Sequence, residues 1–421
     1  MLFFIGVSSI YGDQLLGEII LVQSGVALII VACVPQCLAY MLGGRDADDI
    51  RARFSQGVSA ELAGIGVGLL VLLAALSLPY AKTWQAGALP MFLSLAVQSL
   101  GSCQAWMRLN DRWRSFMLWA LFPNLVRVPL IWLTPIAIDH GLVSGLQGDR
   151  AGVVTLYFLV PDIARLLLIY VPQVARNYVR PKWPAFVAGV RQILQNWLFD
   201  VGSAVTEVAD KIVVGAILGP TTLVVYFFAR RLGVVASMVL EPFYAEHFRR
   251  VLAIGDDHAN TAARATMQRR TYARGAGFAA GLFAAMALMV GLALVVPMFA
   301  VRMPVSIPAH PLLFFSVLLI DCAVAANRWS RYVALVNGGA SILFIVRLLL
   351  FGVFTGGTAW FGNDWGGLGL ALALGIAWSL ETIFLSAWLA RPRVPVMRVR
   401  WGADSFGRHF PCRSELSNRK R

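Results

Sequence analysis

The chain has 421 residues, of which 58% are hydrophobic and only 14% are charged, and its mean hydropathy is +0.70. Soluble domains are about 45–50% apolar and about 25% charged, so this composition excludes a soluble globular protein. A net charge of +14 would indicate a nucleic-acid partner in a soluble protein. Here the basic residues gather in particular connections between apolar segments, so we expect membrane topology to explain them and expect no nucleic-acid partner.

The chain opens with an apolar segment, Met1–Ile10, that is too short to span a bilayer and reads as the last half of a helix. We expect a chain that lacks the beginning of this helix; the alternative is a short outer stub. Eleven further apolar segments have about the 20 residues that a bilayer requires. These predicted transmembrane helices lie at 17–42, 59–80, 86–107, 116–138, 153–174, 190–218, 221–246, 275–298, 311–336, 341–361 and 366–390.

Connections rich and poor in lysine and arginine alternate along the chain. Of the 36 basic residues, 24 lie in alternate connections and the C-terminal tail, 3 lie in the intervening connections, and 9 lie inside predicted helices. Connections rich in lysine and arginine remain in the cytoplasm. We therefore expect a multi-pass protein of the bacterial inner membrane, with its C-terminus in the cytoplasm and Met1 on the outside.

A basic, proline-containing stretch, Asn177–Pro184, is the best candidate for a boundary between two helical lobes. A glycine-led turn at Gly12–Gly17 also has a counterpart at Gly219–Tyr226, and internal repeats of this kind are common in transporters. The predicted parts are an N-terminal helical lobe at 1–176, a basic cytoplasmic linker at 177–189, a C-terminal helical lobe at 190–390 and a basic cytoplasmic tail at 391–421.

No motif in the sequence indicates catalysis or a cofactor. The five cysteines form no CxxC pair and the five histidines form no HExxH motif, so we expect no disulfide framework, no metal site and no cofactor. The longest outer connection, roughly 139–152, is too short to hold the catalytic loop of a polysaccharide polymerase or glycan ligase. We therefore expect a protein that is not an enzyme.

Several charged residues lie deep inside predicted helices, where an ionised side chain costs about 2.5–3.5 kcal/mol and normally faces a cavity or a partner. Fixed arginines in a cavity suit an anionic substrate, because a guanidinium group stays charged and grips phosphate oxygens through a planar fork. The candidate substrate-binding residues are Arg127, Arg165, Arg230, Arg231 and Arg347. The candidate ion-coupling residues are Asp162, Asp200 and Asp321.

These charged residues also have plainer explanations. Asp162 and Arg165 are three residues apart on one predicted helix, a spacing at which they neutralise each other without any ligand. Arg230 and Arg231 are adjacent and point about 100° apart on a helix. We therefore expect only one of these two arginines to face the cavity.

Three segments, Asp210–Pro242, Gly12–Gly43 and Arg108–Arg114, carry a family resemblance. They resemble, in that order, the seventh-to-eighth-helix region, the second helix and a basic loop of the polysaccharide flippases in the multidrug/oligosaccharidyl-lipid/polysaccharide exporter superfamily. The resemblance implies an all-α fold with two six-helix lobes around a central cavity. Relative to that twelve-helix pattern, this chain has about eleven helices and lacks most of the first.

The resemblance also implies a function. Such flippases move a polyprenyl-diphosphate-linked oligosaccharide from the cytoplasmic to the periplasmic leaflet by alternating access, during lipopolysaccharide or exopolysaccharide biosynthesis and export. Membrane lipids, a polysaccharide polymerase and chain-length machinery are the implied partners. The alternatives are a drug or cation exporter of the same fold and an inactive truncated remnant. The excess of arginines deep in the helices argues against a cation exporter.

Overall fold

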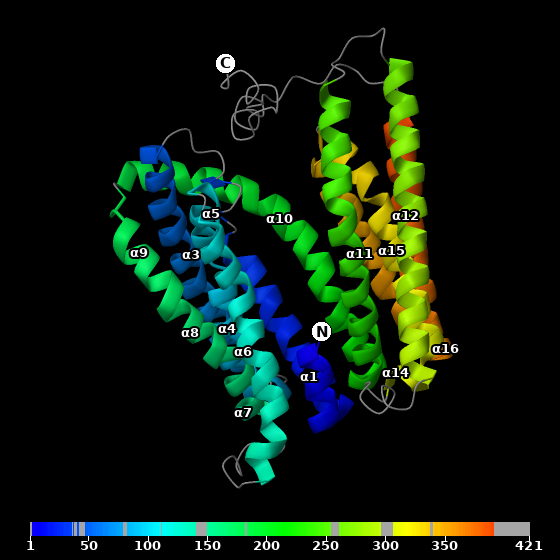
Figure 1. The fold of residues 1–421 in the computed structure, drawn as a ribbon, viewed down its shortest axis with the longest axis horizontal. Helices are drawn as coiled ribbons and strands as arrows, with labels where there is room; N and C mark the ends of the chain where they lie inside the picture. The colour runs from blue at the N-terminus through cyan, green and yellow to red at the C-terminus, as the bar shows by residue number, and fades with distance from the viewer. Residues whose placement is uncertain are drawn as a thin grey trace, which may run out of the picture.

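A computed structural model describes residues 2–35, 37, 40–41, 47–78, 82–110, 112–139, 150–181, 183–253, 261–295, 306–336 and 340–390. Every regular element in this described part is a helix. The helices form two bundles, joined by the long helix α10 (Trp183–Leu218) (Figure 1). The asparagine and proline residues at 177 and 181 fit the short non-helical stretch before α10.

The first bundle contains α1 and the helices from α3 to α9. Its first five helices are α1 (Leu2–Cys33), α3 (Ala47–Leu76), α4 (Lys82–Gln98), α5 (Gly101–Leu109) and α6 (Trp113–Asp139). The remaining part is one long helical path with two π-turns. Its segments are α7 (Arg150–Val154), η3 (Thr155–Leu159), α8 (Val160–Arg165), η4 (Leu166–Tyr170) and α9 (Val171–Asn177).

The second bundle contains the last part of α10 and the helices from α11 to α16. These helices are α11 (Pro220–Ala253), α12 (Thr261–Val295), the short α14 (Ser306–Ala309), α15 (Pro311–Val336) and α16 (Ala340–Ala390). α15 packs between α11, α12 and α16, and α10 packs on α16. The apolar side chains of α11, α15 and α16 form the core of this bundle together with α1, which contacts both α10 and α11.

Three glycines reverse the chain direction where a side chain would strain the backbone. Gly219 (φ 83°) separates α10 from α11, and Gly12 (φ 85°) divides α1. In α16, Gly366 has φ 54° and ψ −129°, a conformation that residues with a Cβ rarely adopt. The chain turns back at this glycine, so the two halves of α16 lie side by side. They are in close contact, since a Cβ at Gly369 would lie only 2.0 Å from the carbonyl oxygen of Phe361.

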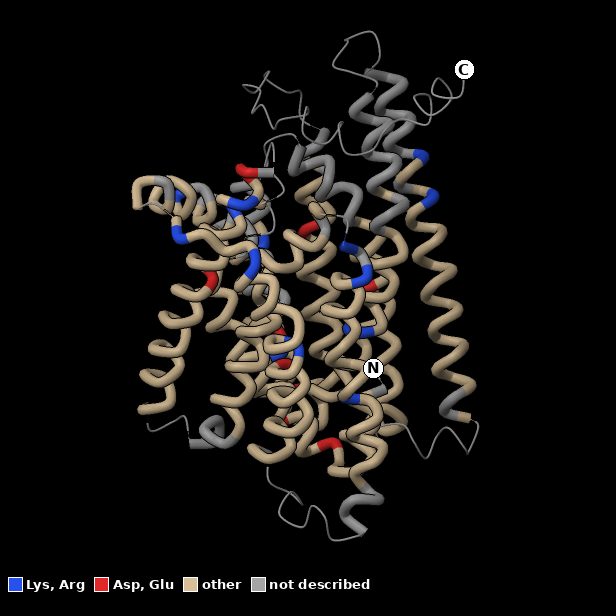
Figure 2. Tube along the Cα trace, turned by 60° about the vertical axis from the view of Figure 1, so that its left-hand side comes forward, with Lys and Arg blue, Asp and Glu red and all other residues tan. Residues whose placement is uncertain are grey.

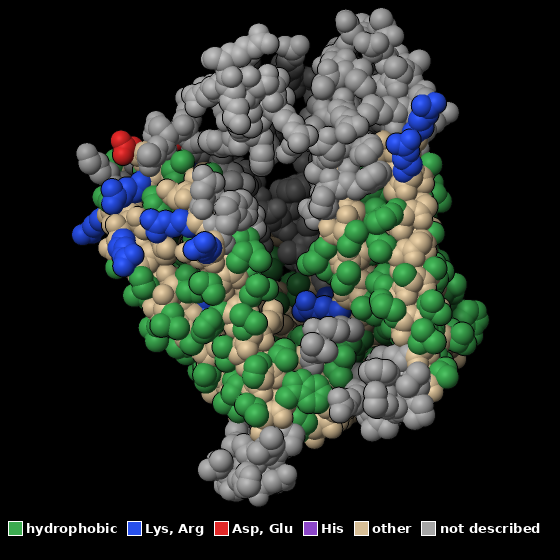
Figure 3. Space-filling model, viewed as in Figure 1, with side chains coloured by type: hydrophobic (Ala, Val, Ile, Leu, Met, Phe, Trp, Pro, Cys, Tyr) green, Lys and Arg blue, Asp and Glu red, His purple; other side chains and the backbone are tan. Residues whose placement is uncertain are grey.

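The two bundles diverge toward one end of the molecule (Figure 1). Most of the described lysine and arginine residues collect in the half nearest that end (Figure 2). The space-filling view shows a hollow between the bundles that opens toward the same end, with lysine or arginine side chains at its floor (Figure 3). The fold therefore has two helical lobes around a central cavity, and the cavity faces the basic side.

By length and composition, seven of the described helices could each cross a membrane. Two of them, Phe3–Cys33 and Ile345–Leu385, contain a glycine reversal, and helices overlap all eleven predicted spans. The segment at 86–107 is interrupted, because α4 ends at Gln98 and α5 begins at Gly101. The prediction of an all-α, polytopic membrane protein with two lobes around a cavity is confirmed.

The lobe boundaries differ in detail from the predicted ranges. α10 begins at Trp183, inside the segment predicted as a linker at 177–189, and its first part packs on α3 of the first bundle. The same helix then continues into the second bundle. The passage from one lobe to the other is therefore a continuous helix. The predicted tail at 391–421 lies outside the described residues.

Candidate functional site

Asp162, which is fully buried on α8, is the centre of a polar cluster in the first bundle. Its carboxylate lies 2.5 Å from the Nη2 atom of Arg127 and 3.0 Å from the Nη2 atom of Arg165. Ser94 Oγ and Gln98 Nε2 donate hydrogen bonds to Asp162 Oδ2 at 2.6 and 2.9 Å. The structure confirms that Asp162 and Arg165 neutralise each other, and it adds Arg127 as a second cation.

A proline explains why Arg127 belongs in this cluster. Pro161 has no N–H group, so the carbonyl of Tyr157, four residues earlier, loses its helical partner. Arg127 Nε donates to that Tyr157 carbonyl at 2.9 Å, and Arg127 Nη2 donates to the carbonyl of Phe158 at 3.4 Å. The π-turn η3 lies in the same place, as expected where a helix is locally rearranged. Arg127 therefore supplies the hydrogen bond that Pro161 cannot donate to the Tyr157 carbonyl, and it also pairs with Asp162.

Neither of these arginines lines the described cavities. Arg127 is 9% exposed and Arg165 is 5% exposed. Arg165 also stacks over the ring of Trp119, with its guanidinium carbon 4.2 Å from the ring centroid, and donates to the carbonyl of the same residue. The structure thus places two predicted substrate-binding residues, Arg127 and Arg165, inside the first bundle, where they join α4, α6 and α8.

A second cluster joins three helices of the second bundle through Arg230, on α11. Its Nη2 atom lies 3.3 Å from Asp210 Oδ2 on α10, and its Nη1 atom pairs with Asp321 Oδ1 on α15. Tyr226 donates its hydroxyl to Asp210 Oδ2 at 2.7 Å, and Lys211 Nζ lies 3.0 Å from Asp210 Oδ1. Both carboxylates are buried, and Arg230 together with Lys211 supplies the two positive charges that balance them inside the lobe.

The local sequence explains how these groups meet. Asp210 lies ten residues before Pro220 and Arg230 lies ten residues after it. Equal spacing on both sides of the Gly219 turn places the two residues at the same depth of the α10–α11 hairpin. Gly233 lets α15 approach α11, because a Cβ there would lie 2.4 Å from the Cβ of Asp321. Equal distance from the predicted turn is the signal that could have identified Asp210 from the sequence.

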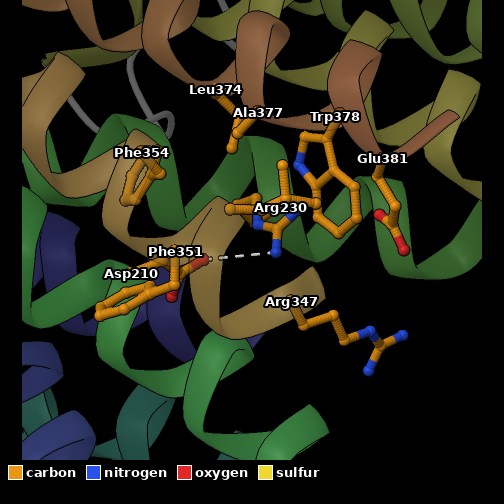
Figure 4. A pocket seen from close by; sticks show the side chains of 10 residues that line it. Asp210, Arg230, Arg347, Phe351, Phe354, Leu374, Ala377, Trp378 and Glu381 are labelled. Atoms are coloured by element: carbon orange, nitrogen blue, oxygen red, sulfur yellow. Dashed lines mark ion pairs between the residues drawn. The ribbon is translucent and has the colours of Figure 1, made fainter. Parts of the chain in front are cut away.

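Arg230 and Trp378 line two cavities beside this cluster. The larger has a volume of about 200 Å³. It is lined by Lys211, Phe227, Arg230, Arg231, Gly233, Val234, Ser237, Asp321, Val324 and Trp378. The smaller, of about 50 Å³, is mostly apolar and is shown in Figure 4. It is lined by Asp210, Arg230, Arg347, Leu350, Phe351, Phe354, Leu374, Ala377, Trp378 and Glu381.

Arg231 differs from its neighbour Arg230 in its surroundings. Its side chain is exposed, and it lines the larger cavity. The guanidinium carbon lies 5.1 Å from the ring centroid of Phe227 and 5.8 Å from that of Phe4, on α1 of the first bundle. Among the described residues no carboxylate forms an ion pair with Arg231. This side chain therefore presents a positive charge between the two lobes.

The other predicted site residues occupy different places. Arg347, on the first half of α16, is half-buried at the edge of the smaller cavity and points away from the pair of Asp210 and Arg230 (Figure 4). Asp200 lies on α10, but its side chain lies outside the described part of the structure. The structure thus brings Arg230, Arg231 and Asp321 together at one cavity. Asp210, Tyr226 and Trp378 were not among the site residues predicted from the sequence, and Lys211 lines the same cavity.

Comparison with known proteins places the fold. No protein-family model matches the sequence, and no curated protein sequence matches it. A solved structure described as the inward-facing conformation of a multidrug resistance MATE family transporter of the MOP superfamily matches with a TM-score of 0.63. The match covers 92% of this chain and 93% of that one at 13% identity. The crystal structure of a MATE point mutant matches with a TM-score of 0.46, at 12% identity, over 92% of this chain and 88% of that one. The first of these matches shows that the chain shares the fold of that MATE family transporter structure.

Proposed function

We propose that this protein is a membrane transporter that carries a polyprenyl-diphosphate-linked oligosaccharide across the membrane by alternating access. The observation that carries the proposal is Arg231, a positive charge exposed in the larger cavity with no carboxylate in an ion pair among the described residues. A diphosphate is a strong anion that cannot enter a low-dielectric region without compensation. A guanidinium group forms charge-assisted hydrogen bonds with phosphate oxygens.

The pairing of three buried carboxylates, Asp162, Asp210 and Asp321, supports an anionic substrate. Asp162 lies between Arg127 and Arg165, and Arg230 pairs with both Asp210 and Asp321. Each of these three carboxylates is already paired with arginine, and Asp210 also with Lys211, whereas a carrier of cations needs carboxylates that are available to its substrate. The larger cavity adds Lys211 and Arg230 beside Arg231, so its lining holds three cationic side chains and one carboxylate, Asp321.

The direct test measures the lipid-linked intermediate in the producing cell. We expect deletion of the gene to leave polyprenyl-diphosphate-linked oligosaccharide on the cytoplasmic leaflet and to remove surface polysaccharide. Re-expression of the full chain is expected to restore both quantities. If the distribution of the intermediate and the amount of surface polymer are unchanged by deletion, the proposal is wrong.

A second candidate function is export of an amphipathic organic cation. The smaller cavity favours it, because Phe351, Phe354 and Trp378 provide aromatic faces beside the buried carboxyl group of Glu381. The neighbour of the same fold is also described as a multidrug resistance transporter. This function predicts that cells gain tolerance to lipophilic cations when the chain is expressed, and that a Glu381→Gln variant abolishes the gain while surface polysaccharide is unaffected.

A further inference from the structure

The first part of α10 runs across the other helices of the first bundle, near the end at which the two bundles diverge (Figure 1). Its inner face is tightly packed, because a Cβ at Gly189 would lie 2.5 Å from Gln56 Oε1 and 2.8 Å from the hydroxyl of Tyr40. Ile193 is buried in a cluster with apolar side chains of α3 and α5. Trp197 Nε1 donates a hydrogen bond to the carbonyl of Val31, on α1, at 3.0 Å. This part of α10 therefore has a fixed orientation on the bundle.

The level of this segment corresponds to one face of the bilayer. Val179 N donates to Ser55 Oγ at 3.0 Å, and the hydroxyl groups of Ser59 and Tyr178 lie 3.1 Å apart. From Gln56 to the end of α3 at Leu76 the helix rises about 30 Å, at about 1.5 Å per residue, which equals the thickness of the hydrocarbon core. The segment thus lies at the level of the lipid headgroups on the basic side of the molecule.

The outer face of the segment is apolar and exposed. Trp183 is 73% exposed, and Val187 and Leu194 are also exposed. These three side chains point within about 40° of one another on the helix, and Arg191 points within about 80° of Trp183. An apolar stripe with tryptophan and an adjoining arginine is typical of helices that lie in the membrane interface.

The same region carries positive charge. Arg176, Arg180 and Arg191 are all exposed, and no ion pair of these three is found among the described residues. The backbone at Arg176 is held in place by Arg51. Arg51 Nε donates to the carbonyl of Asn177 and Arg51 Nη2 donates to the carbonyl of Arg176, at 3.3 Å each. Three arginines are therefore held beside an apolar stripe with their side chains exposed.

We propose that the segment from Arg176 to Leu194 binds anionic phospholipid headgroups of the adjacent leaflet. The apolar stripe inserts beside the acyl chains, and the arginines contact lipid phosphates, a combination of buried apolar area and charge that strengthens interfacial binding. Because α10 continues into the second bundle, the bound lipids anchor the connection between the lobes to the first bundle. This inference does not rest on the proposed transport function.

Tryptophan quenching in nanodiscs tests this proposal with the full chain. The lipids are phosphatidylcholine and phosphatidylglycerol, with bromine on the acyl chains of one or the other. The signal of Trp183 is the difference between the parent protein and Trp183→Phe. We expect bromines near the headgroup to quench Trp183 more than deep bromines, and brominated phosphatidylglycerol to quench about fivefold more effectively than phosphatidylcholine at equal mole fraction.

Matched variants connect the preference to the arginines. We expect Arg180→Gln with Arg191→Gln to remove the preference for phosphatidylglycerol while quenching by phosphatidylcholine remains. The control, Arg270→Gln with Arg274→Gln, changes exposed arginines on α12 and is expected to leave the Trp183 signal unchanged. Equal quenching by the two lipids would overturn the proposal. So would the absence of any Trp183 signal, which would mean that this face meets water or another protein.

Discussion

Arg127 and Arg231 both lie inside membrane helices, but their partners differ. Arg127 contacts the carboxylate of Asp162 and the carbonyl that Pro161 leaves without a helical donor. Arg231 contacts only aromatic rings among the interactions of the described residues. The first arginine therefore stabilises the fold, whereas the second is available to a ligand.

Arg127→Ala is expected to destabilise the first bundle. Removing one partner of a buried ion pair leaves the other charge uncompensated and costs about 3–5 kcal/mol. Thermal unfolding of the purified protein in detergent measures the change. Arg127→Lys should recover only part of the loss, since a lysine cannot reach Asp162 and the Tyr157 carbonyl with a planar fork. An Arg127→Ala protein with parental thermal stability would contradict the structural role.

Arg231→Ala is expected to leave thermal stability nearly unchanged and to weaken transport. Loss of hydrogen bonds to a charged group costs about 1.5–3 kcal/mol, which corresponds to about a ten- to hundredfold loss of affinity. The measurement is binding and translocation of the lipid-linked oligosaccharide in proteoliposomes. Arg231→Lys should keep part of the activity because the charge remains. Arg274→Ala on α12, which removes an exposed arginine outside both cavities, is the matched control.

At the scale of a helical element, α16 is a hairpin whose halves touch through glycine. Gly369 lies so close to Phe361 that no side chain fits between them. The turn itself requires the positive φ of Gly366. Close contact across the hairpin positions Trp378 and Glu381 on the returning half opposite Arg347 and Phe351 on the first half, where both halves line the smaller cavity.

Gly369→Ala and Gly352→Ala are expected to change stability in opposite directions. At Gly369 the new Cβ would meet backbone atoms at 2.0–2.3 Å, so the halves must separate, at a cost of about 1–3 kcal/mol. At Gly352 nothing lies within 4 Å, and alanine inside a helix is favoured over glycine by about 0.5–1 kcal/mol. The measurement is the thermal unfolding temperature of the two purified variants. If the two variants have equal stability, the two halves of α16 are not in close contact at Gly369.

For the whole molecule, the hollow between the bundles opens toward the basic end (Figure 3). The structure therefore corresponds to a state that is open on its basic side. α1 bridges the lobes beneath the hollow. Its residues pack on α10 and α11, and a Cβ at Gly17 would lie 2.3 Å from the carbonyl oxygen of Pro220. The side opposite the basic end is therefore closed by direct contact.

Arg231→Cys is expected to react with a membrane-impermeant thiol reagent from the cytoplasmic side. The readout is labelling in inside-out compared with right-side-out vesicles. The parent chain serves as the control for its own cysteines, of which Cys37, Cys103 and Cys322 are buried. Added lipid-linked oligosaccharide should slow labelling if it occupies the cavity. Faster labelling from the outer side would contradict either the predicted orientation or the assignment of the open side.

The sequence alone determined the fold class and the membrane location of this protein. The evidence was the long apolar segments, the basic connections and the low charge content. Those features predict helices, a membrane and two lobes, because each depends on residues close together in the chain. The neutralising pair of Asp162 and Arg165 was also predictable, since three residues on one helix fix their distance.

Only the tertiary structure decided which charges face the cavity. Arg127 donates to a carbonyl that lies four residues before a proline on another helix. Arg230 pairs with Asp210 and Asp321, which lie on two other helices. Such contacts depend on the rotation of each helix and on close approaches such as that at Gly233. Helical periodicity defines which residues share a face, but packing between helices distant in sequence decides which face is turned to a ligand.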